Sequence, residues 1–171
     1  IEGVMKVDIS GYLTKLENDY NLIARNLPMF QKNNRNIHYQ IEDNFLRVWF
    51  RYIYKYGYML EVGANKKLKI IMDRDYTTYT GKVLEKYFRA QIIESELFTH
   101  ISSWWDRKGE NEIDIIAADE IDNKVIFYEV KRQAKEINLD TLKYKAAQFF
   151  NATGKFKTYD ILYKGLSMEE M

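Results

Sequence analysis

The sequence predicts an α+β protein in which helical segments precede a mixed unit of helices and strands. Two observations lead to this prediction. Residues 80–171 alternate between helical periodicity and short β-type runs, in the order helix, three strands, helix, strand. Residues 1–56 contain a helix, two short β-type runs and a further helix. We therefore expect a first segment at 1–56, a helical linker at 57–79 and a domain at 80–171.

The amino-acid composition limits the kinds of protein and of metal site that this chain can form. Apolar residues make up 46 % of the 171 residues, which is enough for a sizeable core. The chain has no Cys and two His, so thiolate and His-rich metal sites are excluded and carboxylates are the expected metal ligands. The net charge of +1 gives no attraction of the whole chain to nucleic acid. The absence of Cys suits a reducing cytosol, and no apolar run approaches the roughly 20 residues that span a bilayer. We therefore expect a cytoplasmic protein without a membrane partner.

The first segment reads as the second half of a winged helix. A helix is expected over 8–20, capped by Asp8 or Ser10, followed by a strand at 22–25. A polar, basic turn at 31–36 leads to a return strand at 37–41. Because the chain begins with Ile1 rather than Met, we expect further residues upstream.

Two interpretations of this segment stay open. In one, helix 8–20 enters a DNA groove while Lys32 and Arg35 on the basic turn contact phosphates. In the other, the segment is a docking or spacer module, because Glu17 and Asp19 make the same helix a poor surface for phosphates. A further helix over 44–56 follows, with an apolar face made of Phe45, Leu46, Trp49, Phe50 and Ile53.

The middle of the chain predicts two helices. The first covers 58–75, and the second begins at Thr78 or Thr80 and ends near Glu94. Glu85 lies on the second helix beside an apolar stripe that suits packing onto a sheet. That stripe consists of Val83, Leu84, Tyr87, Phe88 and Ile92.

The remaining residues predict the sheet and its last helix. We expect one of Trp104 and Trp105 in the core and the other at the surface. The helix should end at Gly154, because glycine readily adopts the left-handed conformation that closes helices. The expected elements are strands at 97–105, 113–117 and 125–131, a helix at 139–151 and a strand at 157–163.

Three charged residues stand inside apolar strands. Asp114 lies between isoleucines, while Glu129 and Lys131 are two apart and so share one face of a strand. Such charges are costly to bury unless something pairs with them. A bound divalent metal beside a charged substrate would be one partner. The alternative is an ion pair between Glu129 and Lys131, with Asp114 merely near a strand end.

These residues resemble the motif of the PD-(D/E)XK nuclease superfamily. Asp114 is followed, after fourteen residues, by Glu129-Val130-Lys131, and Glu85 matches a glutamate often found on the first helix of that fold. Ile113 stands where the motif has proline. More widely, the chain resembles the C-terminal region of bacterial and archaeal P-loop ATPases, in which a winged helix precedes domain of unknown function 234. That resemblance rests on HYQIEDNFLRVWFRYIY at 38–54, GKVLEKYF at 81–88, NEIDIIA and YEVK.

The resemblance implies a restriction-endonuclease-like αβββαβ core acting on DNA, with an ATPase domain in the same protein. It implies Mg²⁺ or Mn²⁺ held by Asp114, Glu129 and the backbone carbonyl of Val130. Glu85 would support a second metal or a ligand water, and Lys131 would position the attacking water. Lys145 and Gln148, three apart on the following helix, are expected auxiliary contacts to DNA. The sequence contains no GxxxxGK[ST] motif, so these residues do not include the P-loop itself.

Three functional hypotheses therefore remain. The first is a metal-dependent DNA nuclease module regulated by an ATPase. The second is a non-catalytic DNA-binding or regulatory module that keeps the nuclease fold. The third is a winged-helix DNA binder whose C-terminal domain serves for oligomerisation. The sequence leaves both the substrate and homo-oligomerisation open.

Overall fold

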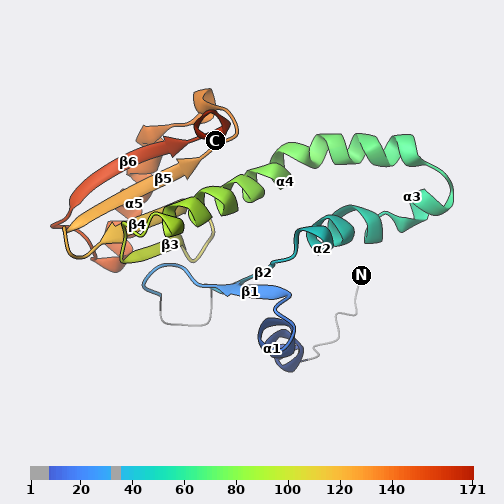
Figure 1. Ribbon diagram of the computed structural model, residues 1–171, viewed down its shortest axis with the longest axis horizontal. Coiled ribbons are helices and arrows are strands. Elements are labelled where there is room, and N and C mark those ends of the chain that lie inside the picture. The colour runs from blue at the N-terminus through green and yellow to red at the C-terminus, as the bar shows by residue number, and fades with distance from the viewer. Residues whose placement is uncertain (1–7, 32–35) are drawn as a thin grey trace. The chain divides into compact units, whose positions relative to one another are not determined.

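The computed structural model describes residues 8–31 and 36–171. These residues form two compact units. Unit 1 contains residues 8–26 and 37–72, and unit 2 contains residues 27–31, 36 and 73–171. Helices combine with a two-stranded and a four-stranded sheet (Figure 1), which confirms the predicted α+β class.

Unit 1 follows the predicted order of helix, strand and return strand. Helix α1 (Ser10–Asn18) leads into β1 (Ile23–Asn26), which pairs antiparallel with β2 (His38–Ile41). Ile9, the residue before α1, gives no side-chain cap, whereas the predicted caps were Asp8 and Ser10. The carboxylate of Asp8 accepts a hydrogen bond from the backbone N–H of Ser10, the first residue of the helix, at 2.9 Å. Lys32 and Arg35, the expected phosphate contacts, lie outside the described residues.

The helix predicted over 44–56 is irregular. It consists of α2 (Asn44–Val48) and a π-helical segment η2 (Trp49–Tyr54), and α3 (Gly57–Glu61) follows. Asp43 caps α2 by accepting a hydrogen bond from the N–H of Leu46 at 2.8 Å. Tyr52 is buried, whereas three residues of the predicted apolar face are exposed: Phe45, Trp49 and Phe50.

Helix α4 (Asn65–Glu94) corrects the prediction of two helices separated near residues 76–80. A new helix was expected there because Thr78 or Thr80 could cap its first turn. However, the Thr80 hydroxyl donates to the carbonyl of Tyr76 at 2.7 Å, one turn earlier in the same helix. The polar side chain is thus satisfied within the helix, which continues without interruption.

Unit 2 is a four-stranded sheet covered on both faces. The strands β3 (His100–Trp105), β4 (Glu112–Asp119), β5 (Lys124–Val130) and β6 (Asp160–Leu166) lie in that order. The first three are antiparallel, and β6 runs parallel to β5. A parallel neighbour requires a crossover, which is supplied by α5 (Leu139–Thr153). Short 3₁₀ turns follow β5 at Ala134–Glu136 and β6 at Met168–Glu170.

The two helices cover opposite faces of this sheet (Figure 1). On one face, Leu84 and Phe88 of α4 pack with alternate residues of β4 and β5, including Ile115 and Tyr128. On the other, Leu142 and Phe149 of α5 pack with the complementary set. Successive residues of the strands point to opposite faces of the sheet, so the strands contribute to two hydrophobic cores, one under each helix.

Helix α5 begins and ends where the sequence indicates. The side chain of Asn138 accepts hydrogen bonds from the N–H groups of Asp140 and Thr141, and Gly154 closes the helix at φ 67°. Strand β6 starts later than predicted, because residues 156–159 form a turn in which the N–H of Tyr159 donates to the carbonyl of Phe156 at 3.1 Å.

Both tryptophans of β3 are buried, which corrects the expectation of one at the surface. The pairing of β3 with β4 shifts register between Ser102 and Trp104. This irregularity interrupts the alternation of faces, so Trp104 and Trp105 are both enclosed. The indole N–H of Trp105 donates to the carbonyl of Asn36 at 3.2 Å.

Of the helices in the described part of the chain, none is long and apolar enough to cross a bilayer.

Candidate functional site

The charged residues of β4 and β5 meet at one end of the unit 2 sheet. Ile115 lies opposite Tyr128, so Asp114 and Glu129 follow at the next position along the two antiparallel strands. The Asp114 carboxylate accepts a hydrogen bond from the backbone N–H of Val130, with Oδ2 and N 2.8 Å apart. That contact ties the start of β4 to the residue between Glu129 and Lys131.

Glu129 is a buried carboxylate, with 4 % of its surface exposed. Its Oε1 lies 3.2 Å from the ammonium nitrogen of Lys131 and 3.6 Å from that of Lys145 on α5. Its Oε2 accepts a hydrogen bond from the N–H of Asn138 at 3.3 Å. Three partners offset the cost of burying this charge. The structure therefore brings Lys145 to the predicted site, and Gln148 lies half-buried one turn further along α5.

Glu85 on α4 lies close enough to Asp114 for their charges to interact. Burial raises the pKa of Glu85, and the nearby Asp114 carboxylate raises it further. Burial also raises the pKa of Asp114, although the Val130 N–H and the ammonium of Lys131 act in the opposite direction. Glu85, Asp114, Glu129 and Lys131, which the sequence singles out, thus lie in one neighbourhood.

Two cations of α4 complete this neighbourhood and are absent from the sequence prediction. The Lys82 ammonium lies 3.0 Å from Glu85 and 3.3 Å from Glu112. The guanidinium of Arg89 donates to the backbone carbonyl of Asp114 at 3.2 Å and to the hydroxyl of Ser103. Positions 82, 85 and 89 follow helical spacing, so the sequence carried a signal that all three share one face.

Arg89 and Ser103 hold the backbone of Asp114 at the irregular part of the β3–β4 pairing. The Ser103 hydroxyl donates to the Asp114 carbonyl at 2.6 Å, so this carbonyl receives two donors. Burial lowers the pKa of Arg89, while the carboxylates of Glu85 and Asp114 act against that shift. The guanidinium therefore balances part of the negative charge of the site.

The donor types at this end of the sheet suit a hard divalent cation. Carboxylate oxygens of Asp114 and Glu129 and the backbone carbonyl of Val130 are the kind of ligand that Mg²⁺ and Mn²⁺ prefer, and Mg²⁺ needs only one or two carboxylates besides water. Within residues 8–31 and 36–171, no three His, Asp or Glu side chains converge into a ready-made metal cluster. A metal would therefore depend on few protein ligands and on substrate or water oxygens.

Comparisons with known proteins agree with the resemblance to domain of unknown function 234. Residues 49–148 match a family described as archaeal and bacterial proteins of unknown function, domain of unknown function 234. An uncharacterized protein of Methanocaldococcus jannaschii is 31 % identical over 182 residues, covering 98 % of this chain and 40 % of that relative. The chain thus spans 40 % of the length of the curated relative it matches. No solved structure matches the chain. The chain belongs to the domain of unknown function 234 family of archaeal and bacterial proteins.

Proposed function

We propose that this chain is a metal-dependent nuclease module that hydrolyses phosphodiester bonds in DNA. The observation that carries the proposal is the meeting of Asp114, Glu129 and Lys131 at one end of β4 and β5, with Glu85 beside them. Glu85 and Asp114 are half-buried acids that repel each other, which is costly for stability and typical of functional sites. The order helix, three strands, helix, strand, together with the spacing of the motif, supports a PD-(D/E)XK nuclease.

Each residue of the site has a task in this chemistry. In hydrolysis, the oxygen of water bonds to phosphorus, the bond to the departing sugar oxygen breaks, and that oxygen takes up a proton. Lys131, whose ammonium is 3.2 Å from Glu129, would orient the attacking water and offset charge on the phosphate oxygens. Lys145 would supply a second positive charge from α5. Glu85 would accept a hydrogen bond from a bound water.

A divalent cation would be held by Asp114, Glu129 and the backbone carbonyl of Val130. When bound, Mg²⁺ or Mn²⁺ would lower the pKa of a bound water and stabilise charge on the phosphate. Arg89 and Ser103 would keep the Asp114 backbone in place for this purpose. By the family resemblance, the intact protein would couple this module to an ATPase domain in the same chain.

Cleavage of plasmid and branched DNA in the presence of Mg²⁺ or Mn²⁺ tests the proposal. We expect wild-type protein to cut, and Asp114→Asn to lose at least about 100-fold in rate because several kcal/mol of charge stabilisation is removed. Asp122→Asn, at an exposed position of the β4–β5 turn, is the matched control. Equal rates for wild type and Asp114→Asn would overturn the proposal.

One observation favours a second function, a DNA-binding or regulatory module that does not cut. Both carboxylate oxygens of Glu129 already contact groups of the chain itself, namely Lys131, Lys145 and the N–H of Asn138. A glutamate held in this way would stabilise the fold without a metal. This alternative predicts DNA binding that does not change with Mg²⁺ and is kept by Asp114→Asn.

A further inference from the structure

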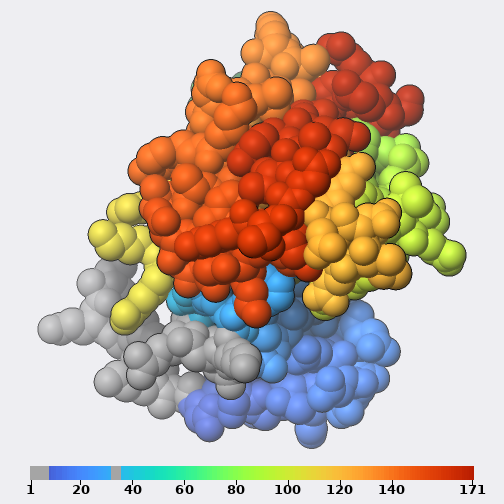
Figure 2. All heavy atoms as spheres, turned by 90° about the vertical axis from the view of Figure 1, so that its left-hand side faces the viewer, coloured from blue at the N-terminus to red at the C-terminus, as the bar shows by residue number. Residues whose placement is uncertain are grey.

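A pocket of about 250 Å³ opens at the other end of the unit 2 sheet. It lies between the β4–β5 turn and the segment that joins α5 to β6, and Figure 2 shows these two segments in contact. The N–H of Asp160 donates to the carbonyl of Asn123 at 2.8 Å and links them. Glu120 contributes from the first segment, residues 154–159 from the second, and Phe30 closes the pocket. Glu120 is the first residue after β4 and lies six positions beyond Asp114, so about 20 Å separates this pocket from the candidate active site.

Three aromatic rings form the apolar part of the pocket. The rings of Phe30 and Phe156 meet edge to face with centroids 5.2 Å apart, and those of Phe156 and Tyr159 lie 4.9 Å apart. Phe156 is buried, whereas 40 % of the surface of Phe30 is exposed. An exposed ring beside a packed aromatic wall is suited to stacking against a flat, partly polar group.

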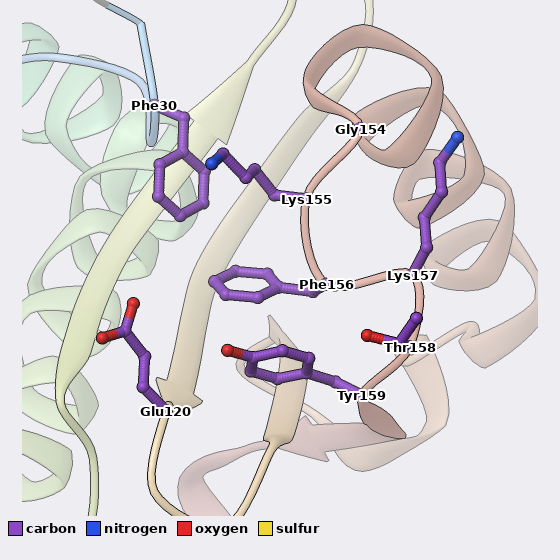
Figure 3. Close-up of a pocket in the computed structure, with 8 residues that line it drawn as sticks. All are labelled: Phe30, Glu120, Gly154, Lys155, Phe156, Lys157, Thr158 and Tyr159. Atoms are coloured by element: carbon purple, nitrogen blue, oxygen red, sulfur yellow. The ribbon is translucent and has the colours of Figure 1, made fainter.

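Three polar groups converge over these rings. In Figure 3 the ammonium of Lys155 reaches the Phe30 ring, and its nitrogen is 5.6 Å from the ring centroid. The Glu120 carboxylate lies on the opposite side of the pocket, and the Tyr159 hydroxyl points toward the side on which Glu120 lies. Lys157 also borders the pocket, but its side chain points away from the rings (Figure 3). The pocket therefore offers a cation at one side and an acceptor at the other.

The backbone at the pocket is strained in two places. Phe30 has φ 62° and Phe156 has φ 59°, both in the left-handed region that bulky residues rarely adopt. Such conformations persist only where surrounding structure enforces them, and they gather at functional sites. The surrounding structure therefore holds both rings at the pocket in fixed positions.

We propose that this pocket binds a nucleotide whose base carries an exocyclic amine, as cytosine does. The base would stack on Phe30, its amine would donate to Glu120, and its phosphate would contact Lys155. A glutamate accepting from the amine of cytosine is an established pairing, and the ammonium is a suitable phosphate partner. One oxygen of Glu120 already pairs with His100, at 3.1 Å between Nε2 and Oε1, which orients the carboxylate. The nucleotide is either free or part of a single strand.

Calorimetric titration of the full chain with dCMP, dUMP and inorganic phosphate tests this proposal. We expect dCMP to bind at least about tenfold more tightly than dUMP, which presents an acceptor to Glu120 instead of a donor. Lys155→Ala should weaken dCMP binding by about tenfold or more, while Lys157→Ala, in the same segment, should leave it unchanged. Glu120→Gln should remove the preference for dCMP over dUMP.

The proposal would be overturned if dCMP and dUMP bound with equal affinity, or if dCMP bound no more tightly than inorganic phosphate. It would also be overturned if Lys155→Ala and Lys157→Ala had equal effects on dCMP binding. Titration with short oligo-deoxycytidine separates the two sources: tighter binding than dCMP assigns the pocket to single strands, and similar binding assigns it to free nucleotide. The proposal does not depend on nuclease activity. Asp114→Asn, which abolishes cleavage if the chain is a nuclease, should bind dCMP as wild type does.

Discussion

The carboxylate of Asp114 accepts a hydrogen bond from the backbone N–H of Val130, with 2.8 Å between the two atoms. Val130 is the residue between Glu129 and Lys131, so this contact joins the two halves of the charged motif. Val130 itself is buried, with 6 % of its surface exposed. The same side chain that would hold a metal therefore also satisfies a buried backbone donor.

This double role predicts different effects for two substitutions at one position. Asp114→Asn keeps an oxygen that can accept from the Val130 N–H, so we expect it to unfold in urea close to wild type. Asp114→Ala leaves that buried N–H unpaired, which should lower the free energy of unfolding by about 1–3 kcal/mol. If both variants unfolded at the same urea concentration, the hydrogen bond would have no structural role.

Gly165 on β6 lies opposite Glu129 of β5 and has no room for a side chain. A Cβ added there would come within 2.4 Å of Cγ2 and 2.6 Å of Cδ1 of Ile137. We therefore expect Gly165→Ala to lower the free energy of unfolding by about 1–3 kcal/mol through overpacking. Adding Ile137→Ala should recover part of that loss.

Gly81 of α4 provides the matched control for that change. A Cβ at Gly81 meets no atom within 4 Å, and alanine favours a helix interior over glycine by about 1 kcal/mol. Gly81→Ala should therefore maintain or raise stability in the same urea experiment. A loss at Gly81 equal to that at Gly165 would show that crowding by Ile137 is not the cause.

The raised pKa of Glu85 predicts how stability depends on pH. Burial and the Asp114 carboxylate raise this pKa in the folded protein. The folded state therefore keeps the Glu85 proton to higher pH than the unfolded chain does. As pH rises from about 4 through the raised pKa, this residue lowers the free energy of unfolding, and the loss then stays constant.

The glutamine of Glu85→Gln cannot ionise, so this variant does not lose stability in the way wild type does. The free energy of unfolding of the variant minus that of wild type should therefore increase between pH of about 4 and 7. Urea unfolding at a series of pH values measures this difference. Glu94→Gln, at the exposed end of the same helix, is the control. A difference that stays flat or falls with rising pH would contradict the role given to burial and to Asp114.

The sequence was a good guide where local signals and tertiary structure agree. Asn138 and Gly154 mark the ends of α5, and the order of elements after α4 follows from hydrophobic periodicity. It was a poor guide where a contact overrides propensity. The threonines near residue 80 stay helical because the Thr80 hydroxyl finds a carbonyl one turn back, and Trp104 is buried because the register of β3 shifts.

The same limit applies to the candidate site. Two-residue spacing on a strand was enough to pair Glu129 with Lys131. Lys145 was expected as an auxiliary contact to DNA, and the structure places it beside Glu129. Helical spacing places Arg89 on the same face of α4 as Glu85, but its contacts could not be predicted. The contacts with Ser103 and the Asp114 carbonyl depend on how α4 crosses the irregular strand. Long-range contacts of this kind leave no pattern in a single sequence.

Calorimetric titration of the full chain with Mn²⁺ tests the central claim most directly, because it measures ligand binding by the site without requiring the right DNA. We predict that wild type binds Mn²⁺ and that Asp114→Asn and Glu129→Gln each weaken this binding by at least about tenfold. Asp122→Asn should bind as wild type does. Absence of Mn²⁺ binding by wild type, or equal binding by all four proteins, would contradict a metal site at Asp114 and Glu129.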